Sequence, residues 1–285
     1  MKIPVIYLVI AVFIGQNSFS QGITPFSLFD AHGKKVKYQK VLKQSLSEDL
    51  VFFGEEHNSA IAHWLQIRLT KDCAKRKSLI LGAEMIEHDN QDELDAYLQN
   101  KINAKQLDST ARLWPNYKTD YKPLVDFAKE NKFPFIGTNI PRRFASLVSK
   151  SGFEILDSLS IEEKAWIAPL PILYDGELPC YKNMLTMMPG HSSPNLPRAQ
   201  AVKDATMAHF ILTNMKEHTL FIHFNGSYHS ENNEGIIWYL RKGNPDSRVL
   251  TITTVTQSQI KTLDKEHFGK ANYIICVDED MTRTY

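Results

Sequence analysis

Two short motifs in this sequence end on a histidine and suggest a shared reactive centre. They are Gly54-Glu55-Glu56-His57 and Gly226-Ser227-Tyr228-His229, and Glu84 lies between them in the chain. Two imidazoles with one or more carboxylates suit a divalent metal ion, or a base and an orienting acid that act on water. Each motif carries little information alone. Because each directly follows an apolar run, the sequence predicts that they meet at one site.

Four side chains are the candidate catalytic residues of this centre: Glu55, His57, Glu84 and His229. Of the two adjacent acids in the first motif, we expect Glu55 to face inward and Glu56 to be solvated. His57, Glu84 and His229 are the expected ligands if the centre holds a divalent metal. The alternative is structural, with both histidines capping helices or bonding to buried carbonyl groups.

The elements that must position these residues are four apolar runs that each end in glycine and polar groups. They are residues 51–57, 78–84, 133–139 and 220–229. Runs of this length, separated by helix-like segments, are typical of parallel strands buried on both faces. In open α/β sheets, ligands bind at the carboxyl ends of the strands. We therefore predict an α/β fold, with a mainly parallel central sheet flanked by helices and a shared site at those ends.

Other segments complete this expected sheet. A hairpin is predicted at 26–38, and further strands at 248–255 and 273–277. Helices are expected at about 38–46, 59–77, 121–131, 141–152, 197–218 and 231–241. Another is expected to open at 89–93, where acidic residues lie in its first turn. His63 lies six positions after His57, about 120° round a helix, and is expected at the surface.

A second group of candidates surrounds the start of the helix at 141–152. Pro141 suits the first position of a helix, so Arg142 and Arg143 would lie in its first turn, next to Asn139 at a strand end. Cations at a helix N-terminus are locally unfavourable, which indicates an anionic partner. The alternative is a solvated face. Asn139, Arg142 and Arg143 are therefore candidate ligand-binding residues.

Residues 153–197 differ in composition from the rest of the chain and contain six of its thirteen prolines. A segment this irregular between two sheet strands indicates a lid. Its methionine, tyrosine and histidine side chains suit a flat apolar ligand such as haem, although clustered methionines are also common in cores. The candidate ligand-binding residues here are Tyr174, Tyr181, Met184, Met187, Met188 and His191.

The first twenty residues have the pattern of a secretory signal peptide. Lys2 precedes an apolar stretch at 3–14, and small residues at 18–20 suit a cleavage site. The stretch is too short to span a membrane comfortably, no later segment is expected to span one, and residues 21–285 are expected to form a single domain. Without Lys2, the 33 basic residues fall to 32 and equal the 32 acidic ones, which argues against nucleic acid as a partner.

The cysteines are an odd set, Cys73, Cys180 and Cys276. At least one thiol is therefore unpaired within a monomer, and the sequence does not say whether the other two are bridged. Their spacing fits no zinc motif. No cysteine directly follows the expected cleavage site near Ser20, so a lipid anchor is not indicated.

Five motifs, in this order, resemble the ChaN-like haem-binding uptake family of the Tiki superfamily. They are Gly54–His57, Gly82–Glu84, Asn139–Arg142, Ala199–Ala208 and Asn225–His229. The resemblance implies an α/β core with an inserted lid at about 153–197, export to the periplasm or outer membrane, and haem bound between two subunits with a tyrosine as axial ligand. In the Tiki and erythromycin esterase branches, matching residues form a hydrolytic centre. No tyrosine here matches the family by motif, so Tyr174 and Tyr181 depend on the composition of the lid.

The sequence therefore predicts an exported haem-binding or iron-binding protein that holds its ligand at the strand ends beneath the lid, as a homodimer. The alternative is a hydrolase that depends on a divalent metal or on an activated histidine. Enzymatic activity is left open between these two hypotheses.

Overall fold

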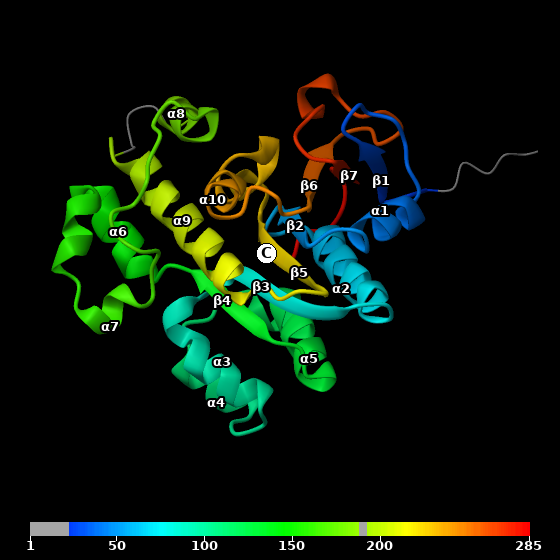
Figure 1. Ribbon diagram of the computed structural model, residues 1–285. Coiled ribbons are helices and arrows are strands. Elements are labelled where there is room, and N and C mark those ends of the chain that lie inside the picture. Colours follow the sequence, from blue (N-terminus) through cyan, green and yellow to red (C-terminus); the bar gives the residue numbers. More distant parts are fainter. Residues whose placement is uncertain (1–22, 188–192) are drawn as a thin grey trace, which may run out of the picture.

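A seven-stranded sheet forms the centre of the molecule in the computed structural model, which describes residues 23–187 and 193–285 (Figure 1). The strands are β1 Phe26–Asp30, β2 Leu50–Glu55, β3 Ser78–Glu87, β4 Phe135–Asn139, β5 Thr219–Gly226, β6 Val249–Gln257 and β7 Tyr273–Asp278. Their order across the sheet is β1-β7-β6-β2-β5-β3-β4. All neighbours run parallel except β1, which is antiparallel to β7 at one edge.

The strands are buried because successive residues pack into cores on opposite faces of the sheet. In β2, Val51 and Phe53 join one core cluster, whereas Leu50 and Phe52 join another. A strand that is apolar on both faces cannot lie at a solvated edge, and β2 lies near the middle of the sheet. The predicted α/β fold with a mainly parallel sheet is confirmed.

Helices cover both faces. They are α1 Tyr38–Ser45, α2 Ala60–Ala74, α3 Gln91–Leu98, α4 Ala104–Thr110, α5 Lys122–Asn131, α6 Arg142–Ser151, α7 Ile161–Lys164, α8 Pro179–Met187, α9 Leu196–Asn214 and α10 Ile236–Gly243. Buried residues of α1 to α5 pack on one face, and those of α8 to α10 pack on the other. Helix α6 packs against α9 beyond the β4 edge, as Figure 1 shows.

Two elements differ from the sequence-based expectation. Helix α4 was not predicted, although a capping box marks its start: the side chain of Asn103 accepts from the Gln106 backbone, and Gln106 bonds back to Asn103. Strand β5 ends at Gly226, and His229 lies in the short 3₁₀ turn Ser227–His229 that follows it. The last histidine of the motif is therefore carried by a turn.

Register places the polar ends of the strands side by side. Glu55 of β2 is opposite Gly226 of β5, and Glu87 of β3 is opposite Asn139 of β4. Parallel strands present their carboxyl ends along one edge of the layer, so these residues share that edge. The strand register therefore explains why motifs that are distant in sequence lie close together.

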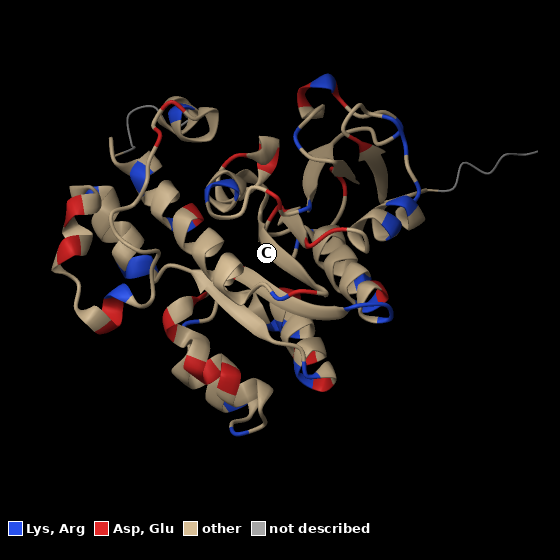
Figure 2. Cartoon of the chain, in the orientation of Figure 1, with Lys and Arg blue, Asp and Glu red and all other residues tan. Residues whose placement is uncertain are grey.

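The remaining general features concern charge, thiols and membranes. Figure 2 shows Lys and Arg interspersed with Asp and Glu along the described chain. Cys73, Cys180 and Cys276 are free and buried, and burial raises the pKa of each thiol to about 12. No helix within residues 23–187 and 193–285 has the length and apolar character needed to cross a membrane. The expected signal peptide, residues 1–20, lies outside the described residues.

Candidate functional site

A cavity of about 510 Å³ opens at the carboxyl ends of β2, β3, β4 and β5. It is lined by charged and polar side chains from all four strand ends and by residues of α6 and α9. The lining residues are Glu55, Glu56, His57, Glu84, Glu87, Trp114, Asn139, Ile140, Arg142, Gln200, Lys203, Gly226, Ser227, Tyr228 and His229. The structure thus brings together Glu55, His57, Glu84 and His229. We call this space the strand-end cavity.

On one side of the strand-end cavity, Glu55 orients His57. The Glu55 carboxylate is buried and accepts from the Tyr121 hydroxyl at 2.7 Å and from Gln66 Nε2 at 2.6 Å. Its Oε1 is also 2.9 Å from His57 Nδ1. Since a carboxylate can only accept, His57 donates from Nδ1, and Nε2 is the ring nitrogen left for a ligand or proton.

Opposing effects act on the pKa of His57. Burial alone would lower it, but the hydrogen bond that His57 donates to Glu55 and the negative charge of Glu84 raise it above the usual histidine value. The ring meets Trp114 edge to face, with the ring centroids 4.9 Å apart. His57 is therefore a basic group held in one orientation, with about a third of its side chain exposed to the cavity.

On the other side, His229 is buried between two carboxylates. Its Nε2 is 3.1 Å from Glu84 Oε1, and its Nδ1 is 2.5 Å from Asp204 Oδ1. Burial would lower the pKa of His229, but the two negative charges raise it to about 10. The ring is consequently an imidazolium at neutral pH. Its charge, with that of His57, keeps the pKa of Glu84 well below the usual range despite complete burial.

Further buried groups complete this arrangement. Glu84 Oε2 accepts from the Gly226 backbone N–H at 2.7 Å, Gln200 Nε2 is 3.0 Å from His229 Nδ1, and the Tyr181 hydroxyl donates to Asp204 Oδ2 at 2.8 Å. Sequence reasoning did not single out Gln200 or Asp204 as functional. Both fall in the stretch Ala199–Ala208 that contributed to the family resemblance, which was the available signal.

The predicted divalent-metal set of His57, Glu84 and His229 does not fit this geometry. Within the described residues, the ligand atoms of these three side chains do not all lie within 4.8 Å of one another, as the ligands of one ion would. Across the described part of the chain, the one group of three or more His, Cys, Asp or Glu residues whose ligand atoms lie this close together is Asp264, Glu266 and His267. These three residues do not line the strand-end cavity. We therefore assign no metal to the strand-end cavity.

The prediction that His63 lies at the surface is wrong. The side chain is 7% exposed, and His63 Nε2 lies 3.0 Å from the carbonyl oxygen of His57. Its Nδ1 is 3.5 Å from Glu55 Oε2. The first turn of α2 packs under the end of β2, so a position 120° round the helix faces the buried polar network.

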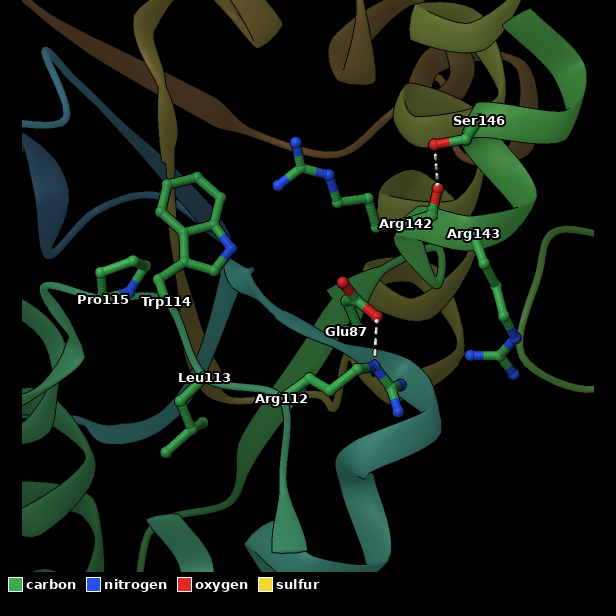
Figure 3. Close-up of a pocket in the computed structure, with 8 residues that line it drawn as sticks. All are labelled: Glu87, Arg112, Leu113, Trp114, Pro115, Arg142, Arg143 and Ser146. Carbon is green, nitrogen blue, oxygen red and sulfur yellow. Dashed lines mark hydrogen bonds and ion pairs between the residues drawn. The ribbon is translucent and has the colours of Figure 1, made fainter. Parts of the chain in front are cut away.

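Arg142 and Arg143 occupy the first turn of α6, as expected, but they point in different directions (Figure 3). The guanidinium of Arg142 extends toward Trp114, and Arg142 also lines the strand-end cavity. Arg143 pairs with Asp89 at 2.5 Å and stacks over Phe144. A second cavity of about 680 Å³ adjoins the first and shares Glu87, Trp114 and Arg142 with it.

Of the expected lid residues whose side chains the structure describes, Tyr174, Tyr181 and Met184 do not line the strand-end cavity. Tyr181 is fully buried behind His229, where its hydroxyl is occupied by Asp204. Tyr174 packs between Phe153 and Tyr181, and Met184 packs against the core beneath α9. Met187 ends α8, while Met188 and His191 lie outside the described residues. Within the described residues of 153–197, Tyr181 therefore contacts the site through Asp204 and does not line its cavity.

Comparison with known proteins gives a family and a fold. A family model described as haem-binding uptake, Tiki superfamily, ChaN matches residues 41–240. The structure is similar to ChaN of Campylobacter jejuni, described by its cofacial haem binding, with a TM-score of 0.65 and 17% identity over 89% of this chain and 97% of that chain. No curated protein matches the sequence.

Two further solved structures are more distant. The type III effector HopBA1 gives a TM-score of 0.49 at 10% identity, over 84% of this chain and 92% of that chain. A mutant of erythromycin esterase EreC in its open conformation gives a TM-score of 0.47 at 10% identity, over 88% of this chain and 83% of that chain.

Proposed function

This chain belongs to the ChaN haem-binding uptake family of the Tiki superfamily, and on that premise we propose that it binds haem in the strand-end cavity. The cavity volume of about 510 Å³ lies within the usual range for small-molecule sites. The adjoining cavity continues past the indole of Trp114, which offers an aromatic wall to a flat ligand. Bound haem would supply an iron centre, and the residues of this chain would hold and orient it.

The observation that carries the proposal is the hydrogen bonding of the two ring nitrogens of His57. Its Nδ1 is fixed by Glu55, and no hydrogen bond to Nε2 is found within residues 23–187 and 193–285. Histidines that bind metals commonly donate their other ring N–H to a carboxylate in this way, and histidine is a frequent axial ligand of haem. A Cβ on Gly226 would lie 2.8 Å from His57 Nε2, so glycine at this position allows the imidazole to lie close to the end of β5.

A hemin titration of the purified protein tests this proposal. We expect a saturable Soret band that His57→Ala and Gly226→Ala each weaken by about tenfold or more, since tenfold corresponds to about 1.4 kcal/mol. Tyr174→Phe is the matched control, because Tyr174 does not line the cavity. Thermal unfolding of each variant separates lost binding from lost folding. Nonsaturable uptake of hemin would rule the proposal out.

Binding should also depend on pH through His57. Protonation of Nε2 competes with iron for the same lone pair. Because Glu55 and Glu84 raise the pKa of His57, hemin affinity is expected to fall as pH decreases through that raised value. His57→Ala should lose this pH dependence along with the affinity.

We also propose that the protein is exported and takes part in haem or iron uptake as a homodimer. Support comes from the family and from the signal-peptide pattern at residues 1–20. Cell fractionation with N-terminal sequencing would test export, with a mature chain expected to start near Gln21. Sedimentation with and without hemin would test the dimer, and a monomer in both states would contradict it.

A second candidate function, hydrolysis, is favoured by the pairing of Glu55 with His57 opposite the buried Glu84–His229–Asp204 group. A base oriented by a carboxylate can accept a proton from water as it attacks an ester or amide. His57 Nε2 would take this proton, while Glu84 stays ionised beside it. Turnover of an ester and amide panel, abolished in His57→Ala but retained in Tyr174→Phe, would support this function. Absence of turnover with normal hemin binding would leave haem binding alone.

A further inference from the structure

The charged side chains that line the strand-end cavity are not all paired. Each carboxylate that lines it has a partner: Glu55 and Glu84 as described above, Glu56 with the Thr256 hydroxyl at 2.7 Å, and Glu87 with Arg112 at 3.3 Å. Two cations that line it, Arg142 and Lys203, have no ion pair or hydrogen bond from their charged ends to any described residue. They come from α6 and α9, on the same side of the cavity as the end of β4. Within the described residues, the cations beside the end of β4 are therefore unpaired.

A buried amide lies beside these cations. Asn139, the last residue of β4, is 8% exposed and lines the same cavity, yet its Oδ1 has no hydrogen-bond partner. A buried polar atom left unpaired costs about 1–3 kcal/mol. The oxygen as placed would need a donor, whereas rotating the amide by 180° puts its NH₂ group in that position, where it can meet an anion. The unpaired position therefore faces the cavity, and the NH₂ orientation is the one that suits an oxyanion.

The N-terminus of α6 adds a third contribution. This ten-residue helix starts at Arg142, and Pro141 before it provides no side-chain cap. Phe144 bonds back to the Pro141 carbonyl, but no acceptor within the described chain receives the backbone N–H of Arg142 or Arg143. Free N–H groups and the helix dipole favour an anion at this point.

The two neighbouring arginines, unlike Arg142, are both paired with acidic residues. Arg112 is paired with Glu87 and Asp89, and Arg143 is paired with Asp89 and packed over two aromatic rings. Of these three arginines that border the two cavities, Arg142 alone keeps its guanidinium unpaired, and it is the one that projects toward Trp114 (Figure 3).

We propose that Arg142, Lys203 and Asn139 form a subsite for an oxyanion carried by the ligand, a carboxylate or a phosphate. Arg142 and Lys203 neutralise the charge, and the Asn139 amide and the first N–H groups of α6 donate to the oxygens. The inference rests on the proposed function for the identity of the ligand. With haem, the oxyanion is a propionate carboxylate.

Comparing hemin with its dimethyl ester, which lacks the carboxylates, tests this subsite. We expect the ester to bind the purified protein about tenfold or more weakly than hemin. Arg142→Met and Lys203→Met should weaken hemin binding by about tenfold and leave ester binding nearly unchanged, so that the preference for hemin disappears. Lys150→Met is the matched control, because Lys150 is exposed in the last turn of the same helix and its loss changes the net charge equally.

The possible outcomes distinguish failure of the subsite from failure of the proposed haem binding. If hemin and ester bind equally well, or Arg142→Met weakens both alike, the subsite is refuted while haem binding stands. If neither porphyrin binds saturably, haem binding fails, and inorganic phosphate then tests the subsite alone. A rise in melting temperature with phosphate in the native protein and Lys150→Met, but not in Arg142→Met, supports an oxyanion site. No rise, or an equal rise in all three, overturns it.

Discussion

His229 is the residue with the most unusual electrostatics. Complete burial of an imidazolium is costly, and only the flanking Glu84 and Asp204 make it favourable. Removing one partner from such a buried group leaves an uncompensated charge, which typically costs about 3–5 kcal/mol. Besides the apolar packing of α9, the group therefore ties this helix to the ends of β3 and β5, most strongly while His229 stays protonated.

Stability should therefore depend on pH through His229. The pKa rises from the ordinary histidine value in the unfolded chain to about 10 in the folded one. The stabilising contribution is fully present below pH 6.5 and decreases as pH rises toward 10, because the unfolded chain releases its proton first. Urea unfolding at pH 6, 7, 8 and 9 should show this decrease in the native protein.

His229→Gln is the control for this prediction. Glutamine removes the titrating group but keeps a hydrogen-bonding side chain, so the variant should be less stable at pH 6 and its stability should change less between pH 6 and 9. Parallel pH profiles in the two proteins would show that His229 does not carry the effect.

Among individual residues, sequence reasoning found those at strand ends and Arg142 at a helix start, but it missed those inside helices. Glu55, His57, Glu84 and His229 follow apolar runs, and parallel register alone brings such residues together. Asp204, Gln200 and Lys203 lie on α9, and His63 on α2. Which way a buried helix is rotated depends on tertiary packing, and both helices are buried on more than one side, so the sequence carries no clear amphipathic pattern to orient them.

Among the elements, the segment at 153–197 was the least predictable. Its prolines, methionines and tyrosines indicated a lid with ligand-binding side chains. Instead, α8 packs against α9, and the Tyr228 hydroxyl bonds to the Cys180 carbonyl, joining α8 to the turn after β5. Aromatic and methionine side chains serve cores and ligand sites equally well, so composition could not separate the two roles.

Tyr181→Phe measures how this segment is attached. The change removes the hydroxyl that donates to buried Asp204, and a lost hydrogen bond to a charged group costs about 1.5–3 kcal/mol. We expect a loss of this size in the free energy of unfolding, with hemin affinity changed less than twofold. Tyr174→Phe should cost less, because its hydroxyl has no hydrogen-bond partner in the described residues. A selective loss of hemin binding in Tyr181→Phe would restore the axial-ligand hypothesis.

In the molecule as a whole, the end of the chain returns to the site. Thr284 donates its backbone N–H to the Asn58 carbonyl at 3.0 Å, and its hydroxyl donates to Asp120 Oδ2 at 2.9 Å. Arg283 forms a backbone bridge with Ser59. Asn58 and Ser59 belong to the loop between β2 and α2 that carries His57. Residues more than 200 positions apart in sequence therefore fix the same loop.

Removing residues 282–285 should loosen that loop while leaving the sheet intact, because β7 ends before them at Asp278. We expect faster amide hydrogen exchange at 56–60, a lower melting temperature and several-fold weaker hemin binding, since an axial ligand on a mobile loop must be ordered at the cost of binding energy. Thr284→Val is the intermediate case, because it keeps the backbone bond to Asn58 and loses only the hydroxyl bond to Asp120. If the truncated protein exchanges at 56–60 as slowly as the full chain, the loop is held by α2 and Ser59 alone, and the orientation of His57 does not depend on the chain terminus.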